Sequence, residues 1–120
     1  VDNRVSDYRY PNTYCEVIKQ GPTRPSWKDK TKFYPVKNRC QFSWYCDGKS
    51  DDIPKYDREV YKIALNIARN IFFGQYKDDI TYGATHYHAD YVYPAWRKSK
   101  TKTLVVGNHI FYRWENNERR

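Results

Sequence analysis

The clearest periodic pattern in the chain lies in residues 57–73, where apolar positions recur at three- and four-residue spacing. These positions are Val60, Ile63, Ala64, Ile67, Ala68, Ile71 and Phe72. The spacing places one apolar stripe along a helix and predicts a long amphipathic core helix. Asp57 is a suitable N-cap residue, and Gly74 is suited to end the helix in the left-handed conformation.

The last third of the chain carries short aromatic and β-branched runs that are typical of strands. These runs are residues 85–88, 91–93, 104–106 and 110–112. Gly107 and Asn108 separate the last two runs, which predicts a hairpin with a two-residue turn. Helices followed by a small antiparallel sheet predict an α+β domain.

The first 35 residues are less regular. Pro11 ends a first short helix, and Thr13 with Glu16 has the spacing of a capping box for a second. Val17 and Ile18 would give this second helix its buried face. Residues 21–35 mix Pro, Lys and Trp without periodicity, which predicts a long basic loop inserted into the domain.

Composition supports one folded domain of 120 residues. Leu, Ile, Val and Phe make up only 22 residues, which with a net charge of +8 is typical of a disordered chain. Thirteen Tyr and four Trp reverse this interpretation, because each ring buries a large apolar surface. No aliphatic or Phe run exceeds three residues, so no transmembrane segment is expected.

The positive charge indicates an anionic partner, such as nucleic acid, anionic lipid or an acidic wall polymer. The Lys and Arg residues are dispersed along the chain, so ordinary solvated loops are an equally good explanation for them. No signal peptide is visible. Since the chain begins with Val, we expect a processed or truncated N-terminus, and the missing signal does not point to the cytoplasm.

Three segments combine aromatic rings with hydrogen-bonding side chains: residues 40–48, 83–89 and 107–113. Proteins bind sugars with this combination, by stacking on C–H faces and by hydrogen bonds to hydroxyls. The alternative is that Phe42, Trp44 and Phe111 are ordinary core residues and the polar groups satisfy one another. Three such clusters together favour a binding site, because buried polar groups are costly without a purpose.

The blocks NRV, YPNTYCEVI, CQFSWYCDG, GATHYHADYVYPAW and GNHIFYR, in this order, resemble the SleB-type cell wall hydrolase family. The resemblance extends from Val1 to about Arg113 and is greatest to the cysteine-containing Gram-negative and phage branch. It implies a lysozyme-like, resuscitation-factor-like fold. It also implies a peptidoglycan hydrolase of the lytic transglycosylase type, which acts on β-1,4 glycosidic bonds without a cofactor.

In this family the catalytic Glu lies on a helix upstream of the NRV block. We therefore expect residues 1–120 to be a single domain that lacks its first, Glu-bearing helix and is inactive alone. None of the five acids that we considered has the partly apolar context that a glycosidase acid requires. The acids considered and set aside are Glu16, Asp47, Glu59, Glu115 and Glu118.

We predict that four residues bind the glycan directly: Gln41, Ser43, Thr85 and Tyr87. Alternation along a strand places Thr85 and Tyr87 on one face, with His86 and His88 on the other. His86, His88 and His109 are expected to form a supporting shell. The same three His could instead bind zinc, but the spacing is unspecific and the resemblance implies no metal.

Cys15, Cys40 and Cys46 allow one disulfide in any of three pairings. The alternative is that Cys15 and Cys46 are small buried residues, as free Cys commonly is. A disulfide would suit a periplasmic or extracellular wall enzyme, or a phage lysis protein. Two other functions remain open. One is a catalytically silent wall-binding module. The other is a single-stranded nucleic-acid binder that stacks bases on Tyr and Trp, although no nucleic-acid partner is expected.

Overall fold

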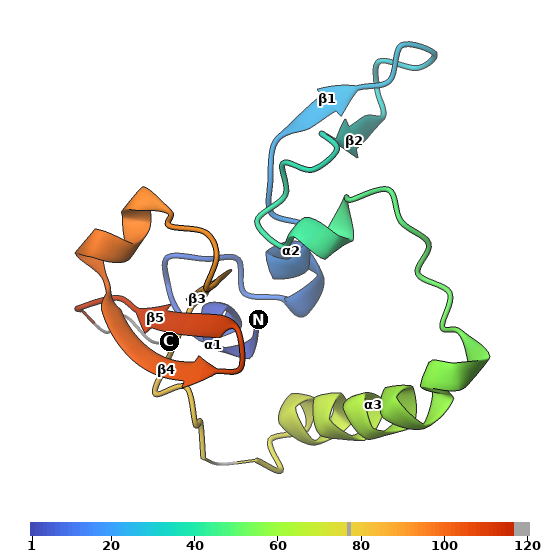
Figure 1. The fold of residues 1–120 in the computed structure, drawn as a ribbon. Helices are drawn as coiled ribbons and strands as arrows, with labels where there is room; N and C mark the ends of the chain where they lie inside the picture. The colour runs from blue at the N-terminus through green and yellow to red at the C-terminus, as the bar shows by residue number, and fades with distance from the viewer. Residues whose placement is uncertain (77, 117–120) are drawn as a thin grey trace.

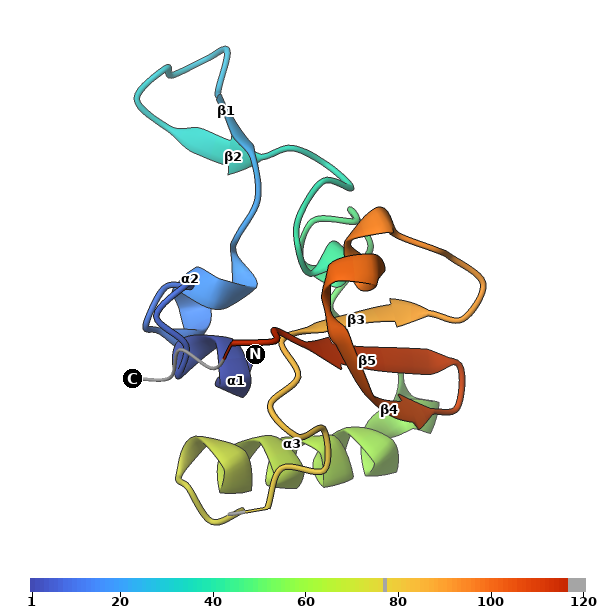
Figure 2. The ribbon, with the colours of Figure 1, turned by 90° about the vertical axis from the view of Figure 1, so that its left-hand side faces the viewer.

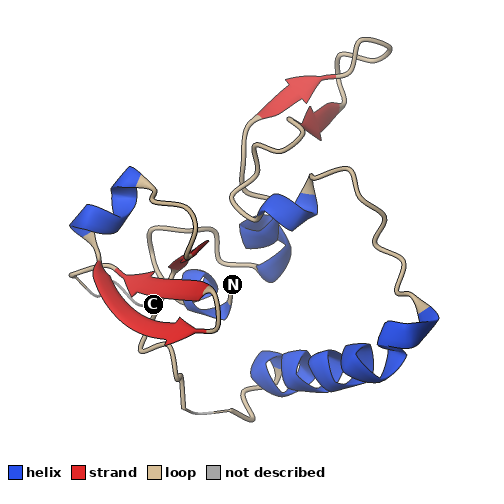
Figure 3. Cartoon of the chain, viewed as in Figure 1, coloured by secondary structure: helices blue, strands red, loops and turns tan. Residues whose placement is uncertain are grey.

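The computed structural model describes residues 1–76 and 78–116, which form helices and two separate antiparallel sheets (Figures 1 and 3). The elements in chain order are α1 (Asp2–Val5), α2 (Tyr14–Ile18), β1 (Thr23–Pro25), β2 (Phe33–Pro35), η1 (Ser43–Tyr45), η2 (Lys55–Asp57), α3 (Arg58–Phe72), β3 (His86–Ala89), η3 (Ala95–Ser99), β4 (Thr101–Val106) and β5 (His109–Arg113). This mixture of one main helix and small antiparallel sheets confirms the α+β class.

The C-terminal sheet has the strand order β3-β5-β4, with both neighbouring pairs antiparallel. Val106 pairs with His109, so Gly107 and Asn108 form the predicted two-residue turn. Gly107 has φ +55°, which matches a type II′ turn, where only the first central residue needs a positive φ. The hairpin prediction is confirmed.

The strand predicted over residues 91–93 is wrong. After β3 the chain turns, because the backbone N–H of Val92 donates to the carbonyl of Ala89 over 3.2 Å. Pro94 is then the N-cap of η3, and proline cannot donate to a strand ladder. Tyr91 and Tyr93 are both 74% exposed in this connection.

The N-cap at Thr13 is confirmed, although the Glu16 carboxylate meets the Thr13 hydroxyl rather than the backbone N–H that a capping box would use. The Thr13 hydroxyl oxygen accepts from the backbone N–H of Glu16 over 3.3 Å, and the same hydroxyl donates to the Glu16 carboxylate over 2.9 Å. Val17, one turn into α2, is completely buried. The α2 helix therefore begins where the sequence predicts and anchors the N-terminal segment through one apolar side chain.

The α3 helix is formed as predicted, and Gly74 follows its C-cap with φ +69°. Its expected role as the core helix is wrong for the described residues, because Val60 and Ile63 are 65% and 63% exposed. Figures 1 and 2 show α3 lying apart from the three-stranded sheet. The ring of Phe72 contacts Tyr14 at 5.2 Å and links the end of α3 to α2.

Residues 21–35 were expected to be an irregular loop, but they contain a two-stranded hairpin. β1 and β2 pair antiparallel, with Arg24 opposite Tyr34. Beyond the strands, the N–H of Ser26 donates to the carbonyl of Lys32 over 2.8 Å. The proline residues predicted a loop, because proline cannot donate to a strand ladder. A two-stranded hairpin has only edge strands, however, and proline is tolerated there.

The buried core is small. Its apolar members are Val17, Cys40, Phe42, Cys46, Ala84 and Tyr112. Cys40 and Cys46 form a disulfide, one of the three pairings left open by the sequence, and Cys15 is exposed as a thiol. The radius of gyration is 16.2 Å, above the roughly 14 Å of a compact domain of this length. No helix in residues 1–76 and 78–116 is long and apolar enough to cross a membrane.

Candidate functional site

Arg4 organises the candidate site from the short helix α1. Only 5% of Arg4 is exposed, and its Nε donates to the carbonyl of Thr85 over 2.8 Å. Its Nη1 donates to the side-chain oxygen of Gln20 over 3.1 Å, and its guanidinium lies 5.2 Å from the ring centre of Phe42. Arg4 therefore joins three segments that are distant in the sequence.

An aromatic cluster covers one face of the C-terminal sheet. His86 and His88 project from β3 toward Trp96 of η3, with ring centres 5.0 and 5.7 Å away. Trp114 meets His86 edge-on at 5.7 Å and donates from its indole N–H to the Tyr10 hydroxyl over 2.8 Å. The aromatic cluster consists of Tyr10, His86, His88, Trp96, Tyr112 and Trp114.

His88 is the buried member of the cluster on β3, with 7% of its surface exposed. Its Nδ1 lies 2.7 Å from the carbonyl oxygen of Ala89, which can only accept a hydrogen bond. The proton therefore resides on Nδ1, and Nε2 accepts from the Tyr112 hydroxyl over 3.0 Å. Both ring nitrogens of His88 are thus hydrogen-bonded, and the ring stacks on Tyr112.

His86 is half-buried, and its Nδ1 lies 2.9 Å from the Thr85 hydroxyl. Burial, with the positive charges of Arg4 and Lys100, lowers the pKa of His86 to about 4. At neutral pH the ring is therefore uncharged. It can orient the Thr85 hydroxyl by a hydrogen bond, but it does not supply a positive charge to a ligand.

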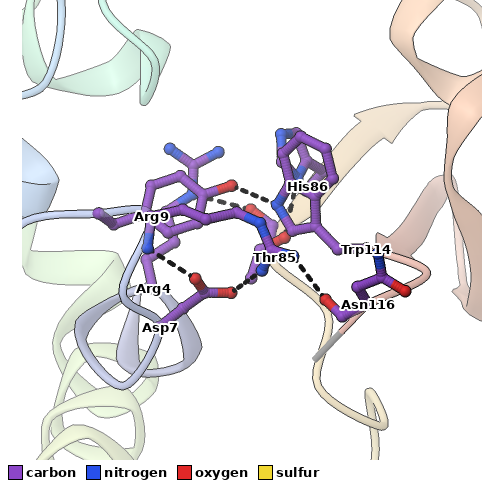
Figure 4. A network of polar contacts seen from close by, with 8 residues as sticks. Arg4, Asp7, Arg9, Thr85, His86, Trp114 and Asn116 are labelled. Carbon is purple, nitrogen blue, oxygen red and sulfur yellow. Dashed lines mark hydrogen bonds and ion pairs between the residues drawn. The ribbon is translucent and has the colours of Figure 1, made fainter. Parts of the chain in front are cut away.

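Three cations surround the aromatic cluster. The Arg9 guanidinium and the Lys100 ammonium lie 4.8 and 4.0 Å from the ring centre of Trp114. Arg9 also pairs with the buried carboxylate of Asp7 over 2.9 Å and donates to the Asn116 carbonyl (Figure 4). The third cation, Arg4, lies 4.6 Å from the ring centre of Tyr10. We call Arg4, Arg9 and Lys100 the positive rim of the cluster, and their charge suits a polar or anionic ligand.

A cavity of about 230 Å³ opens beside this rim. Its lining includes Asn3, Asp7, Thr85, Arg113 and Trp114. Asn3 donates to the carbonyl of Ala84 over 2.8 Å, which holds α1 against the start of β3. The lining offers hydrogen-bonding groups from three segments and one aromatic wall.

The structure separates the four predicted contact residues. Thr85 lines the cavity, whereas the Tyr87 ring contacts Phe111 and His109, each at 5.8 Å. Gln41 and Ser43 are exposed on either side of Phe42, whose ring lies beside Arg4. Arg4 thus lies between the Gln41 to Ser43 segment and Thr85. Direct binding of a glycan by these four residues stays a prediction.

The strand register places His109 on the other face of the sheet from His86 and His88. β3 and β5 pair Tyr87 with Phe111 and Ala89 with His109. Directly opposed residues share a face, so His109 lies on the Tyr87 face, opposite to His86 and His88. His109 can support Tyr87, but the three His rings do not converge. Within the described ranges, no three His, Cys, Asp or Glu residues form a group able to hold a metal.

Several residues of this site were not predicted from the sequence, namely Arg4, Asp7, Arg9, Lys100 and Trp114. Only two of them offered any signal: Arg4 stands in the NRV block, and Trp114 follows the last block directly. The other residues are ordinary charges in irregular segments, and only the folded chain brings them to one place.

The chain belongs to the Cell Wall Hydrolase family, whose family model matches residues 1–112. The match includes α1, the aromatic residues of β3 and most of β5. Comparisons with curated proteins and with solved structures returned no match. Membership of this family indicates a hydrolase that acts at the cell wall, with peptidoglycan as its general substrate.

Proposed function

We propose that this protein cleaves the β-1,4 glycosidic bonds of peptidoglycan as a lytic transglycosylase of the SleB type, in the periplasm or outside the cell. In this reaction a carboxylic acid protonates the leaving glycosidic oxygen. A hydroxyl of the same sugar then attacks the anomeric carbon and closes an anhydro ring, and the carboxylate left by the first step takes the proton of that hydroxyl. Neither water nor a cofactor takes part in the bond change.

The observation that carries this proposal is the position of Thr85. Thr85 lines the cavity, its carbonyl is held by Arg4, and its hydroxyl meets the neutral ring of His86. A hydroxyl that is oriented in this way, beside an aromatic wall and a positive rim, suits a sugar that carries hydroxyls and carboxylates. Gln41, Ser43 and Tyr87 would add contacts along the same glycan strand.

We further propose that the general acid comes from a helix upstream of Val1. The carboxylates near the site already have other partners. Asp7 forms an ion pair with Arg9. For Asp79, burial favours the neutral form, but hydrogen bonds from Thr81, Gly83 and Asn3 outweigh it and keep its pKa below the ordinary value. An acid catalyst needs the opposite shift.

Digestion of purified peptidoglycan sacculi tests both proposals. The 120-residue chain is compared with a longer form that includes the coding sequence before Val1, and released fragments are identified by mass spectrometry. We expect anhydro-muropeptides from the longer form only, since a positioned acid contributes about a hundred- to ten-thousand-fold in rate. Fragments with an ordinary reducing end, formed by attack of water, would instead identify the enzyme as a hydrolase and contradict the transglycosylase mechanism. Binding without cleavage by both forms would favour the catalytically silent module.

A further inference from the structure

The hairpin of β1 and β2 is an exposed element that the site around Arg4 does not use. We call residues 23–35, which comprise both strands and the turn between them, the basic arm. Figures 1 and 2 show the basic arm projecting away from the remaining elements in both views. All of its residues are exposed except Ser26 and Pro35, which are half-buried.

The base of the basic arm is firmly held. The N–H of Gln41 donates to the carbonyl of Gln20, and the N–H of Val36 donates to the carbonyl of Pro22, each over 3.0 Å. Gly21 approaches Cys40 so closely that a Cβ there would lie 2.9 Å from the Cys40 Cα. The disulfide from Cys40 to Cys46 secures the same base. The arm therefore has a defined direction relative to the chain that supports it.

The flank of the basic arm carries exposed rings. Trp27 is 84% exposed, Phe33 62% and Tyr34 54%. An open groove of about 440 Å³ is lined by Arg24, Pro25, Ser26, Trp27, Tyr34 and Pro35. Aromatic walls with a hydroxyl and a guanidinium at hand are the features that bind a sugar ring, by stacking and by hydrogen bonds.

The charge of the basic arm is strongly positive. It carries Arg24, Lys28, Lys30 and Lys32 against a single acid, Asp29. The Asp29 carboxylate is engaged within the turn, where it accepts from the N–H and the hydroxyl of Thr31 over 3.0 and 2.6 Å. The Lys28 ammonium lies 5.4 Å from the ring centre of Trp27, so charge and aromatic surface are adjacent.

We propose that the basic arm is a second glycan-binding surface, which holds a carboxylate-bearing peptidoglycan strand apart from the site around Arg4. Sugar rings stack on Trp27 and Tyr34, and the carboxylates of the strand pair with Arg24 and Lys28. This inference rests on the proposed function for its substrate. A lipid bilayer fits less well, because two of the three exposed rings, Phe33 and Tyr34, lie in β2 and not in the turn.

Co-sedimentation with purified sacculi, stripped of phosphodiester polymers, tests this surface. Trp27→Ala in the full chain is expected to weaken binding about tenfold, whereas Trp27→Phe keeps a stacking face and most of the affinity. The triple variant Lys28→Gln, Lys30→Gln and Lys32→Gln should bind with a weaker dependence on salt. Tyr56→Ala is the control, because Tyr56 is an 87% exposed ring outside the arm.

Circular dichroism and thermal unfolding of each variant verify that the fold is kept. Wild-type affinity for sacculi in both Trp27→Ala and the triple Lys variant would overturn the proposal. So would losses that appear only with anionic vesicles or with a single-stranded oligonucleotide. If a form active on short soluble glycan fragments is available, Trp27→Ala should leave that activity unchanged. Absence of all cleavage would refute the proposed function while leaving the result on arm binding intact.

Discussion

The Nε of Arg4 donates to the backbone carbonyl of Thr85 over 2.8 Å, across 81 positions of sequence. The bond fastens α1 to the start of β3, next to the cavity that Thr85 lines. The same guanidinium lies 4.6 Å from the ring centre of Tyr10. One buried cation thus fixes the position of the residue that we place at the centre of the glycan site.

Replacing Arg4 should therefore destabilise the chain strongly. Arg4→Met leaves the Thr85 carbonyl and the Gln20 amide without their donor, and we expect a loss of about 2–4 kcal/mol in the free energy of unfolding. Arg24→Met is the control, because Arg24 is exposed on the basic arm and should change stability by no more than about 0.5 kcal/mol. Urea unfolding of both variants provides the measurement. Equal effects would show that Arg4 is not the anchor.

Stability should depend on pH through His86. Its pKa is about 4 when folded against an ordinary value of 6.5, mainly because the ring is buried. Between these two values the unfolded chain binds more protons, so the free energy of unfolding falls as the pH falls from 6.5 toward 4. After allowing for the partial exposure of the ring, the effect is roughly 1–2 kcal/mol.

The variant His86→Gln isolates this effect, because Gln cannot be protonated in this range. The difference in unfolding free energy between wild type and variant should shrink or change sign as the pH is lowered through the window. Carboxylates titrate in both proteins and cancel in the difference. A difference that stays constant from pH 7 to pH 4 would show that the His86 ring titrates normally.

The bond between His88 and Tyr112 should have a measurable coupling energy. Tyr112→Phe removes the hydroxyl that donates to the His88 Nε2 and leaves that nitrogen buried without a partner. We expect a loss of about 1–3 kcal/mol. A double-mutant cycle with His88→Phe should then recover part of this loss, since both polar partners are gone. Strict additivity of the two single variants would contradict the bond.

The sequence predicted the local structure well where one short-range signal dominates. The two-residue turn at Gly107, the Thr13 cap and the extent of α3 all depend on neighbours within a few residues. The basic arm was missed because its proline residues suggest a loop, while the pairing of Arg24 with Tyr34 depends on a partner ten positions away.

The candidate site was predicted only in part, because its assembly depends on long-range contacts. Thr85 and His86 lie in an aromatic segment that stands out in the sequence, and the structure places both at the site. Arg4 and Trp114 come from opposite ends of the chain, and both contact Tyr10. The position of His109 follows from the strand register, which a single sequence does not specify.

Binding at the site is expected to require Thr85 and Tyr87. In a form that cleaves sacculi, Thr85→Ala and Tyr87→Ala should each lower kcat/KM about tenfold, the effect of one lost hydrogen bond or stacking contact in the transition state. Tyr91→Ala is the matched control, because Tyr91 is an exposed ring in the loop after β3. Rates of muropeptide release measure the effect. If both variants cleave like wild type, the glycan lies elsewhere.

The exposed apolar face of α3 leads to a last prediction. Ile63 and Ile67 are 63% and 42% exposed, whereas Val17 of α2 is completely buried. The double variant Ile63→Gln and Ile67→Gln should therefore change the unfolding free energy of the 120-residue chain by no more than about 0.5 kcal/mol at each position.

Val17→Ala should cost roughly 1–3 kcal/mol by comparison, through lost burial and a residual cavity. The double variant should also bind less of a hydrophobic dye, because contiguous exposed apolar surface is what such dyes detect. Thermal unfolding and dye fluorescence on the three proteins provide the measurements. If the double variant proves as destabilising as Val17→Ala, then α3 is packed against another surface in solution, and its apolar stripe belongs to a core after all.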